Sequence, residues 1–167
     1  MSNAMAIARK IYVDMDGTLN KRRPNATVQE THQLGFFSSA QPHAGMCALI
    51  GTLLDMGLPV YITSSTYEDG HSENEKREWL ERYIPDLPSN RQIYVPYGVK
   101  KQDYLIHTDN DLLISDHTED ELDSWSGKGV KVLNGHNGKT GRWKGAQISV
   151  DADLSDLLAV VLSALHG

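Results

Sequence analysis

Short runs of apolar, β-favouring residues alternate with helix-like patterns along most of this chain. Parallel neighbouring strands need a long crossover between them, usually a helix, so this alternation favours right-handed βαβ units. A sheet built in this way is mostly parallel and is covered on both faces. We therefore predict an α/β fold of three layers, with strands at residues 10–14, 58–65, 91–95, 111–115 and 130–134.

The segments between these strand candidates show helical periodicity. Apolar residues recur at three- and four-residue spacing over 45–57, 72–84 and 154–165. Two Ser/Thr-x-x-Glu patterns, Ser72 with Glu75 and Thr118 with Glu121, are typical of a capping box and predict that helices begin there. We expect Asp151 to cap the last helix.

Polar side chains stand where three of the strand candidates end. Ligands bind beyond the carboxyl ends of the strands in parallel sheets, so we expect these side chains to share one site. They are Asp14 and Asp16 after the first run, Thr63 and Ser64 after the second, and Asp116 after the fourth.

The chain has the organisation of a single domain. We place this domain at residues 5–167, since no repeat, low-complexity tract or linker-like segment interrupts it. Residues 1–4, MSNA, look like the remnant of an expression tag. The one irregular stretch is an insert at about 20–43, which is long for a loop and is typical of a lid or a small cap.

Composition limits the partners. The net charge of -6 and the pI near 5.6 argue against polymeric nucleic acid as a partner. No apolar stretch approaches the ~18 residues that cross a bilayer, so we expect no membrane partner. A single cysteine fits a reducing compartment and the N-terminus lacks a signal-peptide pattern, so we expect a cytoplasmic location. Cys47 is the only cysteine, which excludes an intramolecular disulfide and a cysteine zinc site, and we expect it to pack in the core. The oligomeric state stays open.

Two carboxylates one residue apart at a buried strand end are costly unless a cation or a transferable proton compensates. Asp14 is suited to attack an electrophile such as phosphorus, while Asp16 exchanges a proton with the leaving group. Mg²⁺ prefers oxygen ligands and would neutralise the pair, with Asp116 as a further carboxylate. The alternatives are a turn-capping aspartate pair and a calcium loop, whose twelfth position needs a glutamate where Asn25 stands.

Four motifs, in order, resemble those of the haloacid dehalogenase superfamily of phosphotransferases. They are DMDGTL, VYITSS, a lysine within VPYGVKKQ, and LLISD. The resemblance implies a Rossmann-like α/β fold in which Asp14 is the nucleophile and Asp16 the general acid and base. It also implies that Thr63 binds the phosphoryl group and that a lysine, Lys101 in preference to Lys100, neutralises its charge.

The same resemblance implies a magnesium cofactor held by Asp14, Asp16 and Asp116, with Asp16 acting through its backbone carbonyl. The likeness is closer to the 5′(3′)-deoxyribonucleotidase branch and its bacterial and phage relatives. It is carried by GFFSSAQPHAGM, by the TSS triplet and by LLISDHTEDELDSWSGKGVKVLNGHNG. In that branch the serine that corresponds to Ser64 also contacts phosphate.

One position departs from the branch, whose last motif usually has two adjacent aspartates where this chain has Ser115. We therefore expect weaker metal binding, and we expect Ser115→Asp to raise metal affinity. The insert is shorter than the helical caps of the animal enzymes, so their nucleotide preference transfers less directly. It holds four candidates for contact with a base or ribose, with surface charge and core packing as the alternative: Arg22, Arg23, Phe36 and Phe37.

We predict a magnesium-dependent phosphomonoester hydrolase that forms an aspartyl-phosphate and acts on a small molecule, in first place a nucleoside monophosphate. The alternative is a phosphate- or nucleotide-binding protein with weak or lost turnover. Ser115 motivates this alternative, and the intact pair of Asp14 and Asp16 opposes it. A receiver-like domain that stores a phosphoryl group is disfavoured, because Asp16 would discharge the acyl-phosphate.

Overall fold

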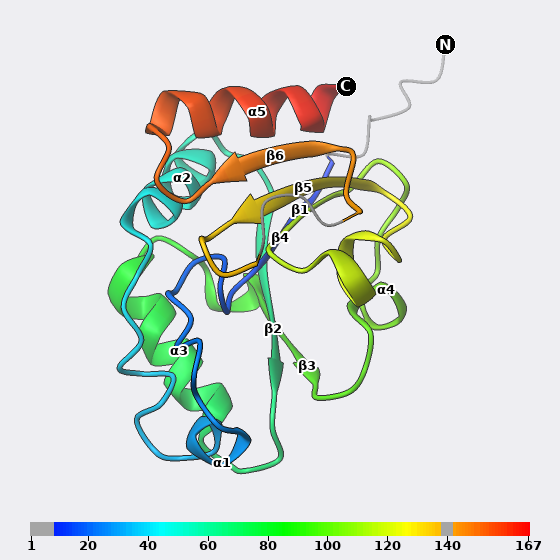
Figure 1. The fold of residues 1–167 in the computed structure, drawn as a ribbon. Helices are drawn as coiled ribbons and strands as arrows, with labels where there is room; N and C mark the ends of the chain where they lie inside the picture. Colours follow the sequence, from blue (N-terminus) through cyan, green and yellow to red (C-terminus); the bar gives the residue numbers. More distant parts are fainter. Residues whose placement is uncertain (1–8, 138–141) are drawn as a thin grey trace.

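A computed structural model describes residues 9–137 and 142–167, so the predicted tag remnant at 1–4 lies outside the described residues. Its six strands form one sheet in the order β3-β2-β1-β4-β5-β6 (Figure 1), and every neighbouring pair is parallel. The predicted α/β fold with a parallel sheet is confirmed. The strands are β1 Ile11–Asp14, β2 Val60–Thr66, β3 Gln92–Pro96, β4 Leu112–Ser115, β5 Lys128–Leu133 and β6 Ala146–Ser149. The helices are α1 Val28–Thr31, α2 Ala44–Asp55, α3 Ser72–Tyr83, α4 Lys101–Tyr104 and α5 Leu154–His166.

The two faces of the sheet are covered unequally. Successive residues of a strand point to opposite faces, so Val13 joins the larger core, which α2, α3 and α5 cover, while Tyr12 lies on the other face. That second face holds a small cluster that includes Leu113 and Trp125. Figure 1 shows α2, α3 and α5 on one side of the sheet and α4 on the other. The result is a three-layer sandwich with one thick and one thin outer layer.

The predicted capping boxes are wrong. Ser72 is the first residue of α3 rather than its cap, and the carboxylate of Glu75 accepts a hydrogen bond from the backbone of Ser38 instead. Asp69 performs the capping, since its Oδ1 accepts from the backbone N–H groups of His71 and Ser72 at 3.1 and 2.9 Å. A sequence pattern of this kind records only local partners, and here a distant loop competes for the glutamate.

Two further helix starts differ from the prediction. Residues Thr118–Leu122 form a distorted helical turn in which Asp120 has a φ of +63°, so the pattern of Thr118 with Glu121 does not open a regular helix. The N-cap position of the last helix is held by Asp153 rather than Asp151, and the Asp153 side chain makes no capping hydrogen bond. β6, α1 and α4 were also not predicted. α1 and α4 have only four residues each, little more than one helical turn, so they show no helical period.

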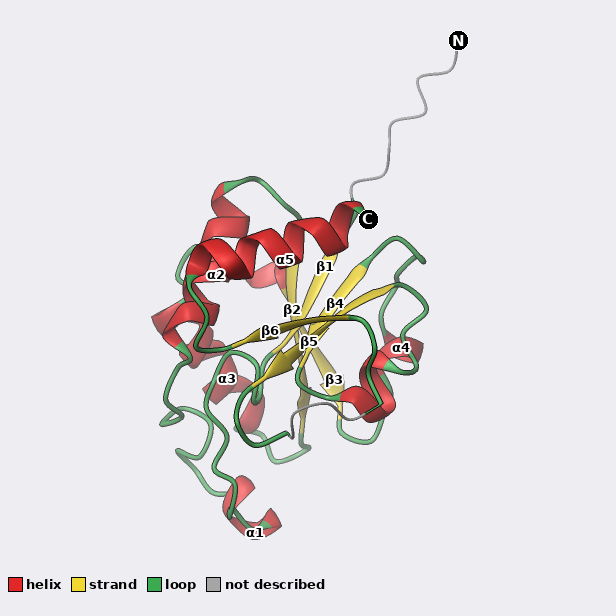
Figure 2. Cartoon of the chain, turned by 45° about the horizontal axis from the view of Figure 1, so that its top comes forward, coloured by secondary structure: helices red, strands yellow, loops and turns green. Residues whose placement is uncertain are grey.

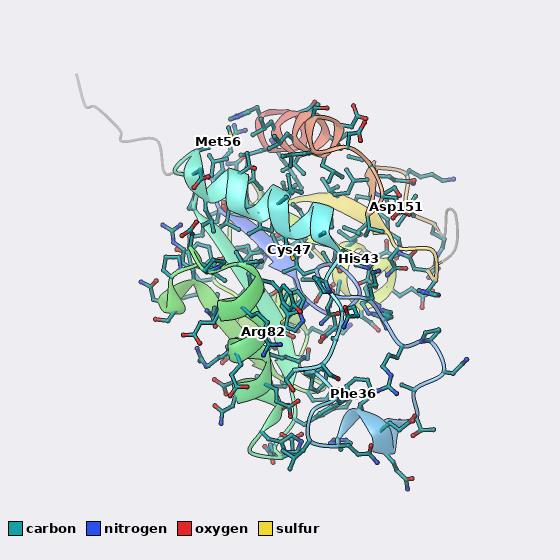
Figure 3. All side chains as sticks on the ribbon, turned by 90° about the vertical axis from the view of Figure 1, so that its left-hand side faces the viewer. Phe36, His43, Cys47, Met56, Arg82 and Asp151 are labelled. Carbon is teal, nitrogen blue, oxygen red and sulfur yellow. The ribbon has the colours of Figure 1, made fainter. Side chains whose placement is uncertain are left out.

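The segment at 20–43 joins β1 to α2 and carries α1. A capping box does occur here, formed by Thr27 and Glu30, whose side chain and backbone groups bond to each other. In Figure 2, α1 extends away from the body of the sheet, and Figure 3 shows Phe36 beside it. The segment therefore lies beside the sheet without adding a strand to it.

Cys47 lies on α2, facing the core (Figure 3), as expected for a packing residue. Burial raises the pKa of its thiol to about 11, which disfavours the reactive thiolate. Within residues 9–137 and 142–167, no helix has both the length and the apolar character needed to cross a membrane.

Candidate active site

The carboxyl ends of three adjacent strands meet at one edge of the sheet. Asp14 ends β1 at the centre, and Thr63 on β2 is its partner in the register. On the other side, Ser115 ends β4 and Asp116 follows it. The sequence-based expectation that these side chains come together therefore agrees with the geometry.

Asp14 is buried and is paired with a lysine. The Nζ of Lys101 donates to its Oδ1 at 2.5 Å. Burial by itself would raise the pKa of Asp14, but the charge of Lys101 and the hydrogen bonds at the carboxylate lower it below its usual value. Lys100, the other lysine of the motif, is exposed and lies 3.6 Å from Asp120. The geometry favours Lys101 as the site lysine.

Asp116 is buried close to Asp14, and its charge is only partly compensated. Arg22 donates from its Nε to Oδ2 at 3.0 Å, and the amide of Asn134 donates to the same oxygen at 3.1 Å. Burial and the negative charge of Asp14 raise the pKa of Asp116 to about 8, against the opposing effect of Arg22. The adjacent buried carboxylates of Asp14 and Asp116 therefore favour the binding of an additional cation.

The donor set around Asp14 and Asp116 fits a divalent metal ion that prefers oxygen. The hydroxyl of Thr18 lies 3.4 Å from Asp14 Oδ2 and 3.3 Å from Asp116 Oδ1, so the two carboxylates converge on one point. Over the described residues, no three His, Cys, Asp or Glu side chains form a metal-binding group. A metal at this point would therefore take two carboxylates and complete its shell with backbone and solvent oxygens.

Gly17 makes the close approach of these groups possible. It has a φ of +82°, which disfavours other residues. A Cβ at this position would lie 2.3 Å from Asp116 Oδ2 and 2.4 Å from Arg22 Nε. Any side chain here would displace Asp116, Arg22 or both.

The carboxylate of Asp16 is turned away from the Asp14–Asp116 pair. Its Oδ1 accepts from Asn20 Nδ2 at 3.0 Å, and its Oδ2 accepts from Lys76 Nζ at 2.6 Å. The hydroxyl of Ser64 also donates to Oδ2, at 3.3 Å. Both carboxylate oxygens of Asp16 are thus occupied by other partners, and Ser64 is engaged with Asp16 in this structure.

Thr63 carries an unsatisfied polar atom. Its hydroxyl is buried and has no hydrogen-bond partner among the described residues. Leaving a buried hydroxyl without a partner costs about 1–3 kcal/mol, so such an atom calls for an explanation. It lies on β2 opposite Asp14 in the register, at the carboxyl edge of the sheet.

Glu121 belongs to the site, although sequence reasoning assigned it to a helix cap. Its Oε1 lies 2.9 Å from Lys101 Nζ, and its Oε2 accepts the proton of the Ser115 hydroxyl. The only sequence signal was an acid six residues after Ser115. The irregular turn at Thr118–Leu122 brings it back to the end of β4. Lys101 is therefore held between two carboxylates, which together raise its pKa although burial opposes this.

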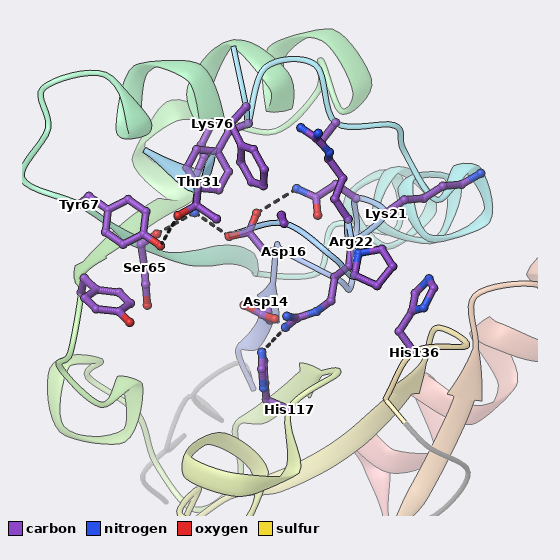
Figure 4. Close-up of a pocket in the computed structure, with 18 of the residues that line it drawn as sticks. Asp14, Asp16, Lys21, Arg22, Thr31, Ser65, Tyr67, Lys76, His117 and His136 are labelled. Atoms are coloured by element: carbon purple, nitrogen blue, oxygen red, sulfur yellow. Dashed lines mark hydrogen bonds and ion pairs between the residues drawn. The ribbon is translucent and has the colours of Figure 1, made fainter. Parts of the chain in front are cut away.

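A cavity of about 550 Å³ opens beside these groups. In Figure 4, Arg22 lies over Asp14 and reaches His117, with which it pairs, while the side chain of Lys21 points away from Asp14. Residues of the 20–43 segment form much of the wall, including Phe36 and Phe37. Arg23 places its guanidinium 5.2 Å from the ring centre of Phe36.

A comparison with protein-family models assigns the chain to a family. The family model described as 5′ nucleotidase, deoxy (pyrimidine), cytosolic type C protein (NT5C) matches residues 14–160. The chain belongs to this family. The NT5C family comprises 5′-nucleotidases of the haloacid dehalogenase type, so the resemblance seen in the motifs is confirmed and the protein is a phosphatase. No curated protein matches this NT5C-family chain.

Two solved structures share the fold of this NT5C-family member. The D,D-heptose 1,7-bisphosphate phosphatase from Burkholderia thailandensis has 18% identity and a TM-score of 0.58, covering 93% of this chain and 99% of that chain. The corresponding enzyme from B. bronchiseptica, complexed with magnesium and phosphate, has 14% identity and a TM-score of 0.59, covering 93% and 98%. At such low identity the likeness establishes the three-layer α/β fold alone.

Proposed function

We propose that this NT5C-family phosphatase hydrolyses nucleoside monophosphates through an aspartyl-phosphate on Asp14, with magnesium as the cofactor. The observation that carries the proposal is the environment of Asp14. Lys101 lies 2.5 Å from one of its oxygens, and the unpartnered hydroxyl of Thr63 stands on the neighbouring strand. A nucleophile flanked by a cation and a free donor suits a dianionic phosphoryl group.

In the first step, an oxygen of Asp14 forms a bond to phosphorus and the bond from phosphorus to the leaving oxygen breaks. The electron pair of that bond stays on the leaving oxygen, which takes a proton from Asp16 in its acid form. Lys101 and the hydroxyls of Thr63 and Ser64 stabilise charge on the transferred group.

In the second step, Asp16 is a carboxylate and takes a proton from water as the water oxygen bonds to phosphorus. The bond from phosphorus to Asp14 breaks and its electron pair returns to the Asp14 carboxylate. Inorganic phosphate leaves, and Asp16 again holds the proton that the next substrate needs.

Magnesium would be held by the carboxylates of Asp14 and Asp116 and by the backbone carbonyl of Asp16. When bound, it neutralises the two buried carboxylates and the phosphoryl oxygens, so that an anion can approach a carboxylate nucleophile. The convergence of Asp14 and Asp116 on the Thr18 hydroxyl supports this position.

The cavity supports a nucleoside as the leaving group. It has room for more than a phosphate, and aromatic side chains form one side of it. A planar base can stack on such a wall, and Arg23 over Phe36 adds a cationic edge. The aromatic side chains are Phe36, Phe37, Tyr67 and Tyr97.

A second candidate is a phosphate- or nucleotide-binding protein with weak turnover. Ser115 in place of an acid favours it, as does the pairing of Arg22 with Asp116 at 3.0 Å, because both reduce the negative charge available to a metal. The presence of both Asp14 and Asp16, with Lys101 paired to Asp14, opposes it.

The test is a magnesium-dependent hydrolysis screen over deoxy- and ribonucleoside 5′-monophosphates and simple phosphate esters. We expect turnover by the wild type, none by Asp14→Asn, and unchanged turnover by Asp86→Asn, which removes an exposed carboxylate outside the site. Negligible turnover by both the wild type and Asp14→Asn would overturn the proposed hydrolase activity. Calorimetric binding of a nucleoside monophosphate to both proteins would then favour the binding function.

A further inference from the structure

Lys76 is a buried cation that the reaction scheme above does not use. It lies on α3, is 1% exposed, and its ammonium group reaches the cavity that holds Asp14 and Asp16. We propose that Lys76 is a positioning residue, which holds Asp16 in the orientation required to exchange a proton with the leaving group. This inference rests on the proposed function.

The ammonium of Lys76 has a partner for each of its three protons. It donates to Asp16 Oδ2 at 2.6 Å, to Ser64 Oγ at 2.8 Å and to the carbonyl of Ser65 at 2.7 Å. The ring of Phe37 covers it, with its centre 4.2 Å from Nζ. One nitrogen therefore ties together α3, the end of β2, the loop after β1 and the 20–43 segment.

Stability of the fold does not explain a charge at this place. Taking an ammonium group out of water costs several kcal/mol, and replacing a buried ion pair by apolar side chains is often neutral or stabilising. The partners of Lys76 are Asp16 and Ser64, which the motifs assign to the reaction, and not the structural acids of α3. The position of the charge points to a role in the site.

Lys76 and Asn20 hydrogen-bond to different oxygens of the Asp16 carboxylate. Asn20 donates to Oδ1 at 3.0 Å while Lys76 holds Oδ2, so the carboxylate cannot rotate without losing one of them. The Asp16 side chain remains 36% exposed, whereas that of Lys76 is 2% exposed. In Figure 4, Lys76 approaches Asp16 from the side of α3, and Asp16 itself lines the cavity.

Comparing two leaving groups distinguishes a role of Lys76 in positioning Asp16 from a role in phosphate binding or in folding. An alkyl oxygen, such as that of a nucleoside, needs a proton as its bond to phosphorus breaks, whereas p-nitrophenolate is stable enough to leave without one. The ratio kcat/KM reports on the path up to the first phosphoryl transfer, before water enters. A residue that acts through Asp16 should therefore matter for a nucleoside monophosphate and much less for p-nitrophenyl phosphate.

The experiment measures kcat/KM of Lys76→Met on both substrates, using a nucleoside 5′-monophosphate that the wild type hydrolyses. We expect a loss of about 100-fold on the nucleotide, and of less than about tenfold on p-nitrophenyl phosphate. Asp16→Asn should show the same imbalance, and the double variant should be no worse than Asp16→Asn alone, because the two residues act as a unit.

Lys131→Met is the matched control, since Lys131 is another buried lysine, on β5, that pairs with Thr118. It should leave the ratio between the two substrates at the wild-type value. If Lys76→Met does not fold, as judged by circular dichroism, Lys76→Gln carries the same test with a shorter, neutral donor.

Equal losses on both substrates would overturn the proposal, because Lys76 would then act on the phosphoryl group or on the fold. Losses that multiply in the double variant would overturn it as well. A wild type that hydrolyses no phosphomonoester would instead refute the proposed function, and that result is separate from the imbalance tested here.

Discussion

Glu121 bridges Lys101 and Ser115. Its Oε1 lies 2.9 Å from the ammonium of Lys101, and its Oε2 accepts the proton of the Ser115 hydroxyl. A carboxylate is thus present at the end of β4 although Ser115 itself is not acidic. The acid is supplied from six residues further along the chain, by the turn that follows the strand.

This bridge changes what is expected of Ser115→Asp. The new carboxylate would face that of Glu121 in a buried place, so we expect the single variant to lose about 1–3 kcal/mol of stability instead of simply gaining metal affinity. The gain in magnesium affinity should appear in Ser115→Asp combined with Glu121→Gln, with Glu121→Gln alone as the control. Thermal unfolding and calorimetric magnesium titration test this; a single variant as stable as the wild type would show that the bridge is unimportant.

Arg22 and a metal ion compete for Asp116. Because the Nε of Arg22 already donates to Oδ2 at 3.0 Å, Arg22→Ala should strengthen magnesium binding. We expect magnesium affinity to rise about tenfold, which corresponds to ~1.4 kcal/mol, because Arg22 no longer competes for Asp116. Calorimetric titration measures it. Arg23→Ala, whose guanidinium lies over Phe36 instead, should leave magnesium affinity unchanged; equal gains in both variants would indicate a general charge effect.

Thr63→Val should separate stability from phosphate binding. The valine has the same shape but removes a buried hydroxyl that has no partner among the described residues, so stability should stay level or rise by up to about 1 kcal/mol. The inhibition constant for inorganic phosphate should rise by about tenfold, because a hydrogen-bond donor to the phosphoryl group is lost. Thr66→Val on the same strand is the control. A Thr63→Val protein that binds phosphate normally would remove Thr63 from the site.

Asp69 contributes stability that depends on pH. Burial opposes its ionisation, but the backbone N–H groups of Ser72 and His71 lower its pKa to about 2, from 3.8. The contribution is therefore fully present above the unfolded pKa and is lost as pH falls through 4 towards 2. Asp69→Asn should be less stable than the wild type by about 1 kcal/mol at pH 7, the usual value of a helix cap, and the gap should close in acid. Urea unfolding across this pH range measures the gap, and a constant difference would contradict the assignment.

The order of strands and helices could be predicted from the sequence because it follows from local patterns. Apolar runs and helical spacing are properties of neighbouring residues, and five of the six strands were found in this way. The meeting of Asp14, Thr63 and Asp116 could be predicted as well. Parallel strands place all their carboxyl ends at one edge, whatever the details of packing.

The helix caps show where local patterns fail. Ser72 with Glu75 satisfies the capping pattern as well as Thr27 with Glu30 does, yet only the second pair forms the box. The difference is the backbone of Ser38, which lies far away in the sequence and takes the Glu75 carboxylate. A pattern read along the chain does not contain that competitor.

The partners of the site residues were decided by the tertiary structure. Lys100 and Lys101 are neighbours with the same chemistry, yet Lys101, the first residue of α4, is buried against Asp14, whereas Lys100 just before the helix is exposed. Lys76 carried no sequence signal, and the pattern that contained Glu121 indicated a helix cap rather than a site residue. The order of strands and helices along the chain follows from local periodicity in the sequence. The partner of a long charged side chain depends instead on which distant segments pack around it.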